Sequence, residues 1–540
     1  IIFMNILSFH CSHHGAVSVA SEGKLIVHCE LSRLNKQKYF PRPDYNLIKK
    51  IDSLGLEYDV VLFSMSPDNC FNMYEEHLLR RLHVKPDAKI YIKTEHHLFH
   101  ASCSKNFKNN FDNYFVWDGN GAVINVEGEE GTETYSLWNN KLNLQKRYLS
   151  TNNCVDFSNK KNYLSFKNIG IGEAYTSLCR ELRLYEKDNF SEGKAMALST
   201  YGKYDQELHK KIFNDNEGFN RNNINIYSIG KEFGDRKKYT TFKKYNTDKE
   251  NIEAQNYAYT FQRGVEELGL KIIKDLNIEG SICFSGGVTQ NVLLNTFLTK
   301  NLNQPIEFDP ICNDQGISLG NLNYFLNGEL EGGSTCYLGF KPSYEDICIF
   351  NKQFEIEDAN VVDAANIVRE NPVALFQGRS EQGQRGLGNR SLLMNATHPD
   401  CIEKVNKVKK REWYRPFACS ILNEELNNYF VVDNNRNPEF MMHVFNARFL
   451  KKKELQNVIS KDGTCRLQSV TKIKNSYLHE LLMFSLENFG YPFLLNTSLN
   501  LPGSPIVEDL QDLKEMMLAS DLKYAWLPDI QKMVKKKDHY

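Results

Sequence analysis

Short apolar runs that end in turn residues constrain the fold of this 540-residue chain more than any other feature. Residues 5–9, 16–20 and 25–29 have the length and composition of β-strands. Stretches with apolar residues at helical spacing lie further along, over 252–276 and 291–302. Strands that alternate with helices predict an α/β fold. No apolar run approaches the roughly 20 residues of a membrane-spanning helix, so we expect no membrane association.

The length of the chain predicts more than one domain, because a single core rarely grows beyond about 250–300 residues. The stretch 329–335 is polar and contains two glycines, as a linker does. We therefore predict one domain at 1–340 and a second at 341–540. Near the far end, 532–537 is rich in lysine, and we expect a solvated, frayed tail there.

The 13 cysteines include no two that are two or three residues apart. This spacing argues against a structural zinc site and a disulfide framework, and it favours buried thiols in a reducing cytoplasm. The first residues of the chain lack a basic leader and a cleavage signature, so we expect no secretion signal.

The formal net charge of −1 gives no overall attraction to nucleic acid, so a polyanion must bind at a local patch. Residues 378–391 are the strongest candidate, since three arginines lie among four glycines directly after the apolar run 373–376. Glycine lets a backbone approach a ligand, and arginine binds phosphate or carboxylate through paired donors. A solvated, charged turn is the alternative. A second dense basic cluster at 409–417 favours the anion site.

Histidines gather after two of the predicted strands. His10, His13 and His14 follow the first strand, and His96 and His100 follow the strand at 89–93. In a helix, His96 and His100 would project from one face at the spacing of two metal ligands, although a surface pair is the alternative. Asp314, at a later strand-to-helix turn, is the best candidate for a third ligand. A helix N-cap is the alternative role for this aspartate.

Three further polar segments have the composition of ligand-binding loops. Ser285-Gly286-Gly287-Val288 lies between a strand and a helix, where backbone N–H groups can meet a ribose or phosphate. The loops 462–466 and 496–500 are polar, and the second follows the strand at 493–495. Together with the arginine loops, they could converge on a small anion and a polyphosphate.

Taken in order, these segments resemble the O-carbamoyltransferases of the nodulation-factor, cephalosporin and tobramycin type. The matching segments are His13 with Glu30 and Arg33, His96–Ala101, Asp118–Gly121, Glu192–Met196, Gly286–Val288 with Asn291 and Asn295, Gly378–Ser391, Asn406–Phe417, Asp462–Arg466 with Gln468, and Asn496–Val507. Two departures are His14, where the family has Asp, and Gln384, where it has Pro. In the first loop, His13 best matches the family histidine, and His10 is the alternative.

The resemblance implies a fold and a reaction. The N-terminal part is similar to the actin, sugar-kinase and Hsp70-like (ASKHA) ATPase fold, and the C-terminal part to the YrdC-like adenylate-forming fold. The family uses carbamoyl phosphate and ATP with Mg²⁺, forms carbamoyl-adenylate in the second domain, and transfers the carbamoyl group to a hydroxyl in the first. A divalent metal (Fe, Mn or Zn) in the transfer domain, a cytoplasmic location and a homodimer are also implied.

The resemblance also implies roles for individual residues. The catalytic set is His13, Arg385, Lys409, Arg415 and Arg466, with His13 as the general base. The nucleotide-binding set is Asp118, Gly119, Lys194, Gly286, Gly287 and Asn291. The carbamoyl phosphate-binding set is Arg379, Arg390, Arg411, Asn496, Thr497 and Ser498. The metal ligands are His96, His100 and Asp314.

Two alternatives remain from the sequence. The same two folds serve threonylcarbamoyl modification of tRNA, but the net charge of −1 and the lack of an arginine-rich arm argue against a nucleic-acid acceptor. A non-catalytic ATP-binding regulatory protein is the second alternative, and the dense arginine loops argue against it. We expect the polar excursion at 205–250 to influence the choice of a hydroxylated small-molecule acceptor.

Overall fold

The computed structural model divides the chain into two compact units. Unit 1 comprises residues 1–94, 314–412 and 416–540, and unit 2 comprises 95–313 and 413–415. The structure describes residues 4–12, 14–38, 45–64, 81–119, 121–150, 162–166, 170–186, 189–214, 218–219, 247–433 and 435–537. Among these residues, no helix is both long and apolar enough to cross a membrane.

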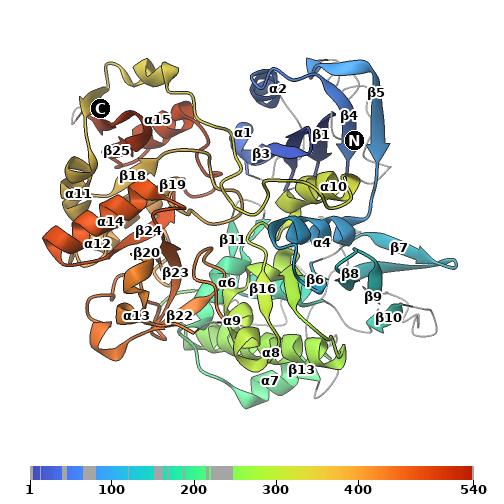
Figure 1. Cartoon of the computed structure of the whole chain (residues 1–540). Coiled ribbons are helices and arrows are strands. Elements are labelled where there is room, and N and C mark those ends of the chain that lie inside the picture. The colour runs from blue at the N-terminus through green and yellow to red at the C-terminus, as the bar shows by residue number, and fades with distance from the viewer. Residues whose placement is uncertain are drawn as a thin grey trace. The chain divides into compact units, whose positions relative to one another are not determined.

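The first lobe of unit 1 is a five-stranded sheet in the order β3-β2-β1-β4-β5 (Figure 1). Its strands are β1 (Asn5–His10), β2 (Ala16–Ser21), β3 (Lys24–Glu30), β4 (Tyr58–Phe63) and β5 (Val84–Ile92). β2 runs antiparallel to both of its neighbours, whereas β1, β4 and β5 run parallel. The helices of this lobe are α1 (Leu31–Leu34), α2 (Tyr45–Asp52) and α10 (Ile317–Phe325), and a short 3-10 turn η3 (Asp314–Gly316) precedes α10.

Unit 2 repeats this topology. Its main sheet has the order β10-β9-β8-β6-β15-β16, and β7 pairs with β8. The strands are β6 (Asn113–Trp117), β7 (Val123–Val126), β8 (Glu129–Asn139), β9 (Leu144–Ser150), β10 (Tyr163–Phe166), β15 (Ile282–Ser285) and β16 (Ile306–Phe308). β8 is antiparallel to β6 and β9, while β6, β15 and β16 run parallel, as the equivalent strands of the first lobe do. This duplication confirms the expected ASKHA-type fold.

Asparagine side chains cap two of the helices of unit 2. Asn251 accepts a hydrogen bond from the N–H of Ala254 at the start of α8, and Asn291 caps α9 in the same way. The helices are α4 (His96–Phe107), α5 (Ile171–Glu181), α6 (Glu192–Ser199), α7 (Gln206–Ile212), α8 (Ile252–Asp275) and α9 (Val292–Asn301), with η2 (Gly287–Gln290) before α9. Two short hairpins pair β11 (Tyr185–Glu186) with β12 (Asn189–Phe190) and β13 (Phe213–Asn214) with β14 (Gly218–Phe219).

The C-terminal part of unit 1 is a ten-stranded sheet in the order β17-β26-β25-β18-β19-β24-β20-β23-β22-β21 (Figure 1). Its strands are β17 (Phe354–Asp358), β18 (Val373–Phe376), β19 (Arg390–Asn395), β20 (Ala418–Leu422), β21 (Phe430–Val431), β22 (Val444–Ala447), β23 (Thr464–Val470), β24 (Phe493–Ser498), β25 (Tyr524–Leu527) and β26 (Lys532–Lys536). The helices are α11 (Val361–Glu370), α12 (Cys401–Lys409), α13 (Leu426–Tyr429), α14 (Ser476–Phe489) and α15 (Leu510–Leu518), with short turns η4 (Glu345–Phe350), η5 (Asn423–Glu425), η6 (Phe449–Lys451) and η7 (Pro528–Ile530). This part is α/β, as expected.

One expectation about the C-terminal region is wrong. The segment predicted to be a frayed tail is β26, which pairs antiparallel with β17 and β25. Met533 and Val534 are buried in the core of the sheet, and their burial outweighs the charge of the neighbouring lysines. Lysine side chains of this strand form ion pairs with acidic residues. Lys532 Nζ lies 2.6 Å from Asp358 Oδ1.

Candidate functional site

Potential metal ligands of unit 2 lie together at the start of α4 and at the carboxyl end of β6. His96 and His100 lie one turn apart on α4, and their Nε2 atoms are 3.2 Å from each other. Asp118 directly follows β6, and its Oδ2 lies 3.0 Å from His96 Nε2 and 3.6 Å from His100 Nε2. Asp314 is the next residue in the chain after Asn313, where this stretch of unit 2 ends. The ligand atoms of His96, His100, Asp118 and Asp314 all lie within 4.8 Å of one another.

The donor set fits a divalent metal. Two imidazole nitrogens and two carboxylate oxygens are a borderline set that suits Fe(II), Mn(II) or Zn(II). Burial alone would raise the pKa of Asp118, but hydrogen bonds to His100 and His96 outweigh it and hold the pKa well below its usual value. The carboxylate is therefore in the charged form that a metal requires.

Sequence reasoning placed the three predicted ligands in one cluster but missed Asp118 as the fourth. The family resemblance had implied a nucleotide-binding role for this residue instead. Its position at the carboxyl end of a strand, where ligands gather in α/β sheets, was the signal for a metal role. The other carboxylate oxygen, Oδ1, accepts hydrogen bonds from the N–H groups of Gly119 and Gly287, at 2.8 and 3.0 Å.

Glycines allow the two predicted nucleotide turns to meet. Because β6 and β15 are parallel neighbours, the turns that follow them lie at the same edge of the sheet. Gly286 has a φ of +87°, and a Cβ there would lie 2.1 Å from the carbonyl oxygen of Trp117. At the start of α5, a Cβ on Gly172 would lie 2.7 Å from Gly119 Cα. The structure therefore brings Asp118, Gly119, Gly286 and Gly287 together.

Asn291 and Lys194, the remaining predicted nucleotide residues, are both buried. Asn291 caps α9 and exchanges hydrogen bonds with Gln262 at 3.0 and 3.2 Å, and Gln262 also accepts from the hydroxyl of Tyr175. This network gives Asn291 a structural role. Lys194 lies in the buried face of α6. Their nucleotide-binding roles stay predictions.

His13, the predicted general base, lies outside the described residues, as does most of the 205–250 excursion. The alternative base, His10, is 5 % exposed, and its Nδ1 lies 2.8 Å from the carbonyl oxygen of Ser64. Because a carbonyl only accepts, this contact requires the proton of His10 to be on Nδ1.

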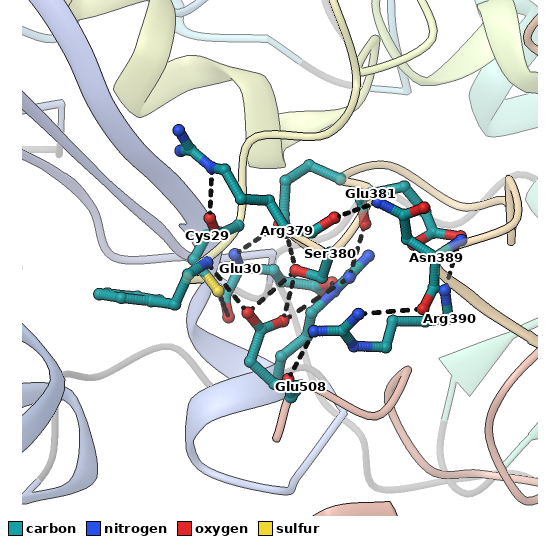
Figure 2. A network of polar contacts seen from close by, with 12 residues as sticks. Cys29, Glu30, Arg379, Ser380, Glu381, Asn389, Arg390 and Glu508 are labelled. Carbon is teal, nitrogen blue, oxygen red and sulfur yellow. Dashed lines mark hydrogen bonds and ion pairs between the residues drawn. The ribbon is translucent and has the colours of Figure 1, made fainter. Parts of the chain in front are cut away.

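The loop Gly378–Ser391, called here the glycine–arginine loop, uses two of its three arginines on main-chain oxygens (Figure 2). Arg379 donates to the carbonyls of Gly339, Ile26 and Leu338 at 2.6–2.8 Å. Arg390 is fully buried and donates to the carbonyls of Gln377, Gly378, Asn389 and Glu508 at 2.6–3.3 Å. Burial lowers the pKa of both guanidinium groups. Their predicted contact with carbamoyl phosphate is untested, and these hydrogen bonds give both a structural role.

The end of β24 gathers several of the predicted anion-site residues. Lys409 Nζ donates to the carbonyls of Ser498 and Asn500 at 2.7 and 2.6 Å. Arg411 donates to the hydroxyl of Thr497 at 2.6 Å and stacks on Phe417, 4.7 Å from the ring centre. These contacts join the basic cluster 409–417 to the polar loop that begins at Asn496.

Asn496 lies at the centre of this arrangement. Its amide nitrogen donates to Gly386 O, Ser420 Oγ and Gln468 Oε1, at 3.1, 2.7 and 3.1 Å. The side chain is fully buried, and among the described residues its amide oxygen has no hydrogen-bond partner. A buried acceptor without a donor costs free energy, about 1–3 kcal/mol, unless a ligand supplies the donor. Sequence reasoning included Gln468 in a motif but gave it no role.

The other three predicted catalytic cations are half-buried. Arg385 lies in the glycine–arginine loop and Arg466 on β23, both in unit 1. Arg415 belongs to unit 2, together with Trp413, whose indole N–H donates to the carbonyl of Thr247 at 2.9 Å. The prediction had put Arg415 in the same group as Lys409 and Arg411.

Models of one protein family match both parts of the chain. The carbamoyltransferase N-terminus model matches residues 71–322, and the carbamoyltransferase C-terminus model matches 364–535. Among solved structures, HypF of T. kodakarensis is similar to this chain at 12% sequence identity and a TM-score of 0.34. The similar region covers 61% of this chain and 48% of the HypF chain, and the likeness is too weak to carry an argument.

Curated relatives come from archaea and bacteria. The protein MJ1051 of Methanocaldococcus jannaschii is 30% identical over 371 residues, which cover 65% of this chain and 70% of that protein. Nodulation protein NolNO of Sinorhizobium fredii is 27% identical over 572 residues, covering 94% and 77%. The 3'-hydroxymethylcephem-O-carbamoyltransferase of Streptomyces clavuligerus is 36% identical over 162 residues, covering 30% and 29%. The chain belongs to the carbamoyltransferase family, and it is a transferase.

Proposed function

We propose that the protein is an ATP-dependent O-carbamoyltransferase that makes carbamoyl-adenylate from carbamoyl phosphate and ATP and passes the carbamoyl group to the hydroxyl of a small molecule. The named relative from S. clavuligerus is an O-carbamoyltransferase, which supports a hydroxyl as the acceptor. The family match extends over both parts of the chain, so a reaction in two stages has two folds to serve it.

The observation that carries the proposal is the amide oxygen of Asn496 at the end of β24, which has no hydrogen-bond partner within the part of the chain that the structure describes. The carbamoyl group carries an NH₂, which is the donor that this oxygen lacks. Lys409 and Arg411 lie beside the same strand end and provide positive charge for a phosphorylated ligand. A small planar amide joined to phosphate matches this combination of groups.

In the proposed first stage, water releases phosphate from carbamoyl phosphate, and the carbamate oxygen attacks the α-phosphorus of ATP. The bond between the α-phosphorus and the pyrophosphate oxygen breaks, and carbamoyl-adenylate and pyrophosphate form. Arg385, Arg466 and Lys409 stabilise the charge on the departing phosphates. Asn496 holds the carbamoyl NH₂ and so fixes the orientation of the attacking oxygen.

In the proposed second stage, the acceptor hydroxyl attacks the carbamoyl carbon, and AMP leaves with the bridging oxygen. His13 takes the hydroxyl proton, since an imidazole titrates near neutral pH. Asp118 is held by the N–H groups of Gly119 and Gly287, which keeps one carboxylate oxygen directed at His96 and His100. A divalent metal bound by this group and Asp314 would supply Lewis-acid polarisation of the reacting anhydride.

The test is to incubate the protein with ATP, Mg²⁺ and carbamoyl phosphate and to measure pyrophosphate release. We expect release that depends on carbamoyl phosphate, and we expect Asn496→Ala to reduce it about 100-fold, because a buried orienting hydrogen bond is lost. His13→Ala should leave this first stage unchanged and abolish transfer to an acceptor. Pyrophosphate release that does not depend on carbamoyl phosphate would contradict the proposal.

A further inference from the structure

Arg33 is a buried cation for which the two proposed stages give no role. It lies in α1 of the first lobe and is 1 % exposed. Its Nη1 donates to the carbonyl of Glu381 at 2.6 Å, and its Nη2 donates to the carbonyl of Gly383 at 3.1 Å. The carboxylate of Glu508 lies 3.9 Å away and offsets the buried charge. Both carbonyls belong to the glycine–arginine loop, which lies about 350 residues further along the chain.

Two more contacts tie this loop to the same segment of the first lobe. Gln382 Oε1 accepts a hydrogen bond from the N–H of Glu30 at 3.1 Å. Arg379 donates to the carbonyl of Ile26 at 2.6 Å. Figure 2 shows Glu30, Arg379 and Glu381 in one continuous network. The end of β3 and the start of α1 therefore support the loop from one side.

The opposite side of the loop supports the proposed carbamoyl site. The carbonyl of Gly386 accepts a hydrogen bond from Asn496 at 3.1 Å, and the carbonyl of Leu387 accepts one from Gln468. Gly386 also packs on β24 so closely that a Cβ would lie 2.8 Å from Ser498 Cα. The orientation of Asn496 and Gln468 thus depends on where the loop backbone lies.

Glu381 joins the two sides into one rigid piece. This side chain is fully buried, and its Oε1 accepts hydrogen bonds from the N–H groups of Leu387, Asn389 and Arg390. A carboxylate that binds three backbone N–H groups closes the loop on itself. A displacement at the Arg33 end is therefore transmitted to Gly386 and Leu387 rather than absorbed by the loop.

We propose that Arg33 is a positioning residue for carbamoyl-adenylate formation, acting on the site in the C-terminal sheet from the first lobe of the chain. The inference rests on the proposed function. It means that the adenylate-forming site is not confined to residues 341–540, because part of its support comes from β3 and α1. A displacement of about 1 Å in a site of this kind can cost about 100-fold in rate.

The experiment compares Arg33→Met and Arg33→Lys with the wild-type protein, in carbamoyl phosphate-dependent exchange of pyrophosphate into ATP. We expect Arg33→Met to lower kcat by about 30-fold or more and to raise KM for carbamoyl phosphate about tenfold, with KM for ATP within about twofold. KM for carbamoyl phosphate should change more than KM for ATP, because the loop contacts Asn496 and Gln468, which we propose to bind the carbamoyl group. Arg33→Lys should recover part of the loss, since an ammonium group can donate to one of the two carbonyls.

Two further variants guard against a trivial loss of folding. Lys36→Met is the matched control, because Lys36 is an exposed cation of the same segment that pairs with Asp512 and Glu515 and should leave exchange unchanged. Gln382→Met removes the contact with Glu30 without removing a buried charge, and we expect KM for carbamoyl phosphate to rise about threefold. This variant decides the matter if Arg33→Met does not fold.

The outcomes separate the inference from the function on which it rests. No exchange by the wild-type protein would refute the proposed function itself. Exchange by Arg33→Met and Gln382→Met within twofold of wild type would overturn the role of Arg33. A loss in kcat with an unchanged KM for carbamoyl phosphate and a lowered Tm would also overturn it, because that pattern marks a loss of folded enzyme only.

Discussion

Buried charges in this protein act mainly on the backbone. Arg33, Arg379 and Arg390 donate to main-chain carbonyls, and Glu381 accepts from main-chain N–H groups. Each charge is satisfied by several hydrogen bonds, which offset the cost of removing it from water. The sequence predicted an anion site from Arg379 and Arg390, because binding a phosphate and holding a backbone require the same donors. Only the contacts distinguish the two uses.

The buried side chain of His28 predicts a loss of folding stability at acid pH. Burial first, and then the cations Arg33 and Arg379, lower the pKa of His28 to about 3. The unfolded chain binds this proton near pH 6.5, so the stability is complete above pH 6.5 and is lost as the pH falls towards 3, by about 1.4 kcal/mol per unit. We expect Tm to fall less between pH 7.5 and 5 in His28→Asn than in wild type.

The control for this titration is His83→Asn, since the side chain of His83 is 59% exposed. Thermal unfolding followed by circular dichroism at several pH values gives the comparison. If Tm falls equally with pH in wild type and His28→Asn, His28 is not the cause of the loss of stability at acid pH.

The metal cluster gives a second prediction at this scale. His100→Ala removes one of four donors, and we expect the affinity for Mn²⁺ or Zn²⁺ to fall about 100-fold or more, since even the loss of a residue that only orients a metal ligand costs about 10–100-fold. Isothermal titration and the metal content after dialysis measure this. His83→Ala is the matched control, and a His100→Ala protein that binds metal as tightly as wild type would refute the cluster as a metal site.

At the scale of elements, neighbouring strands bring the functional loops to shared edges of the sheets. β6 and β15 bring Asp118 and Gly287 together, and β24 brings Asn496 to the glycine–arginine loop. Strands and helices with strong periodicity were predicted to within a few residues, as α8 shows. β26 was missed because its lysines suggested exposure to solvent, whereas the strand pairs with two neighbours and buries Met533 and Val534.

Gly386 packs closely against β24, and this contact can be tested by substitution. A Cβ at this position would lie 2.8 Å from Ser498 Cα and 3.1 Å from its nitrogen, and backbone atoms cannot move aside cheaply. We expect Gly386→Ala to destabilise the protein by about 1–3 kcal/mol, lowering Tm, and to reduce carbamoyl phosphate-dependent pyrophosphate exchange.

The control is Gly193→Ala in α6, where a Cβ would meet no heavy atom within 4 Å. Alanine in place of an interior helical glycine stabilises by up to about 1 kcal/mol, so Tm should not fall. Equal Tm changes for the two variants would contradict the close packing of the loop on β24.

At the scale of the whole molecule, the chain holds two copies of one sheet topology and a larger C-terminal sheet. The order of motifs was sufficient to predict the α/β fold and the family. The grouping of residues 1–94 with the C-terminal sheet was not predictable, because it rests on contacts such as that of Arg33 with Glu381 across almost 350 positions. Predicting such pairs requires the loop path, which no local pattern encodes.

The central claim is that the C-terminal sheet activates a carbamoyl group with ATP. The most direct test is pyrophosphate release from ATP and Mg²⁺, measured with and without carbamoyl phosphate. We expect release only with carbamoyl phosphate, and a loss of about 100-fold in Asn496→Ala. Release that is equal with and without carbamoyl phosphate, or that is unchanged in Asn496→Ala, would contradict it.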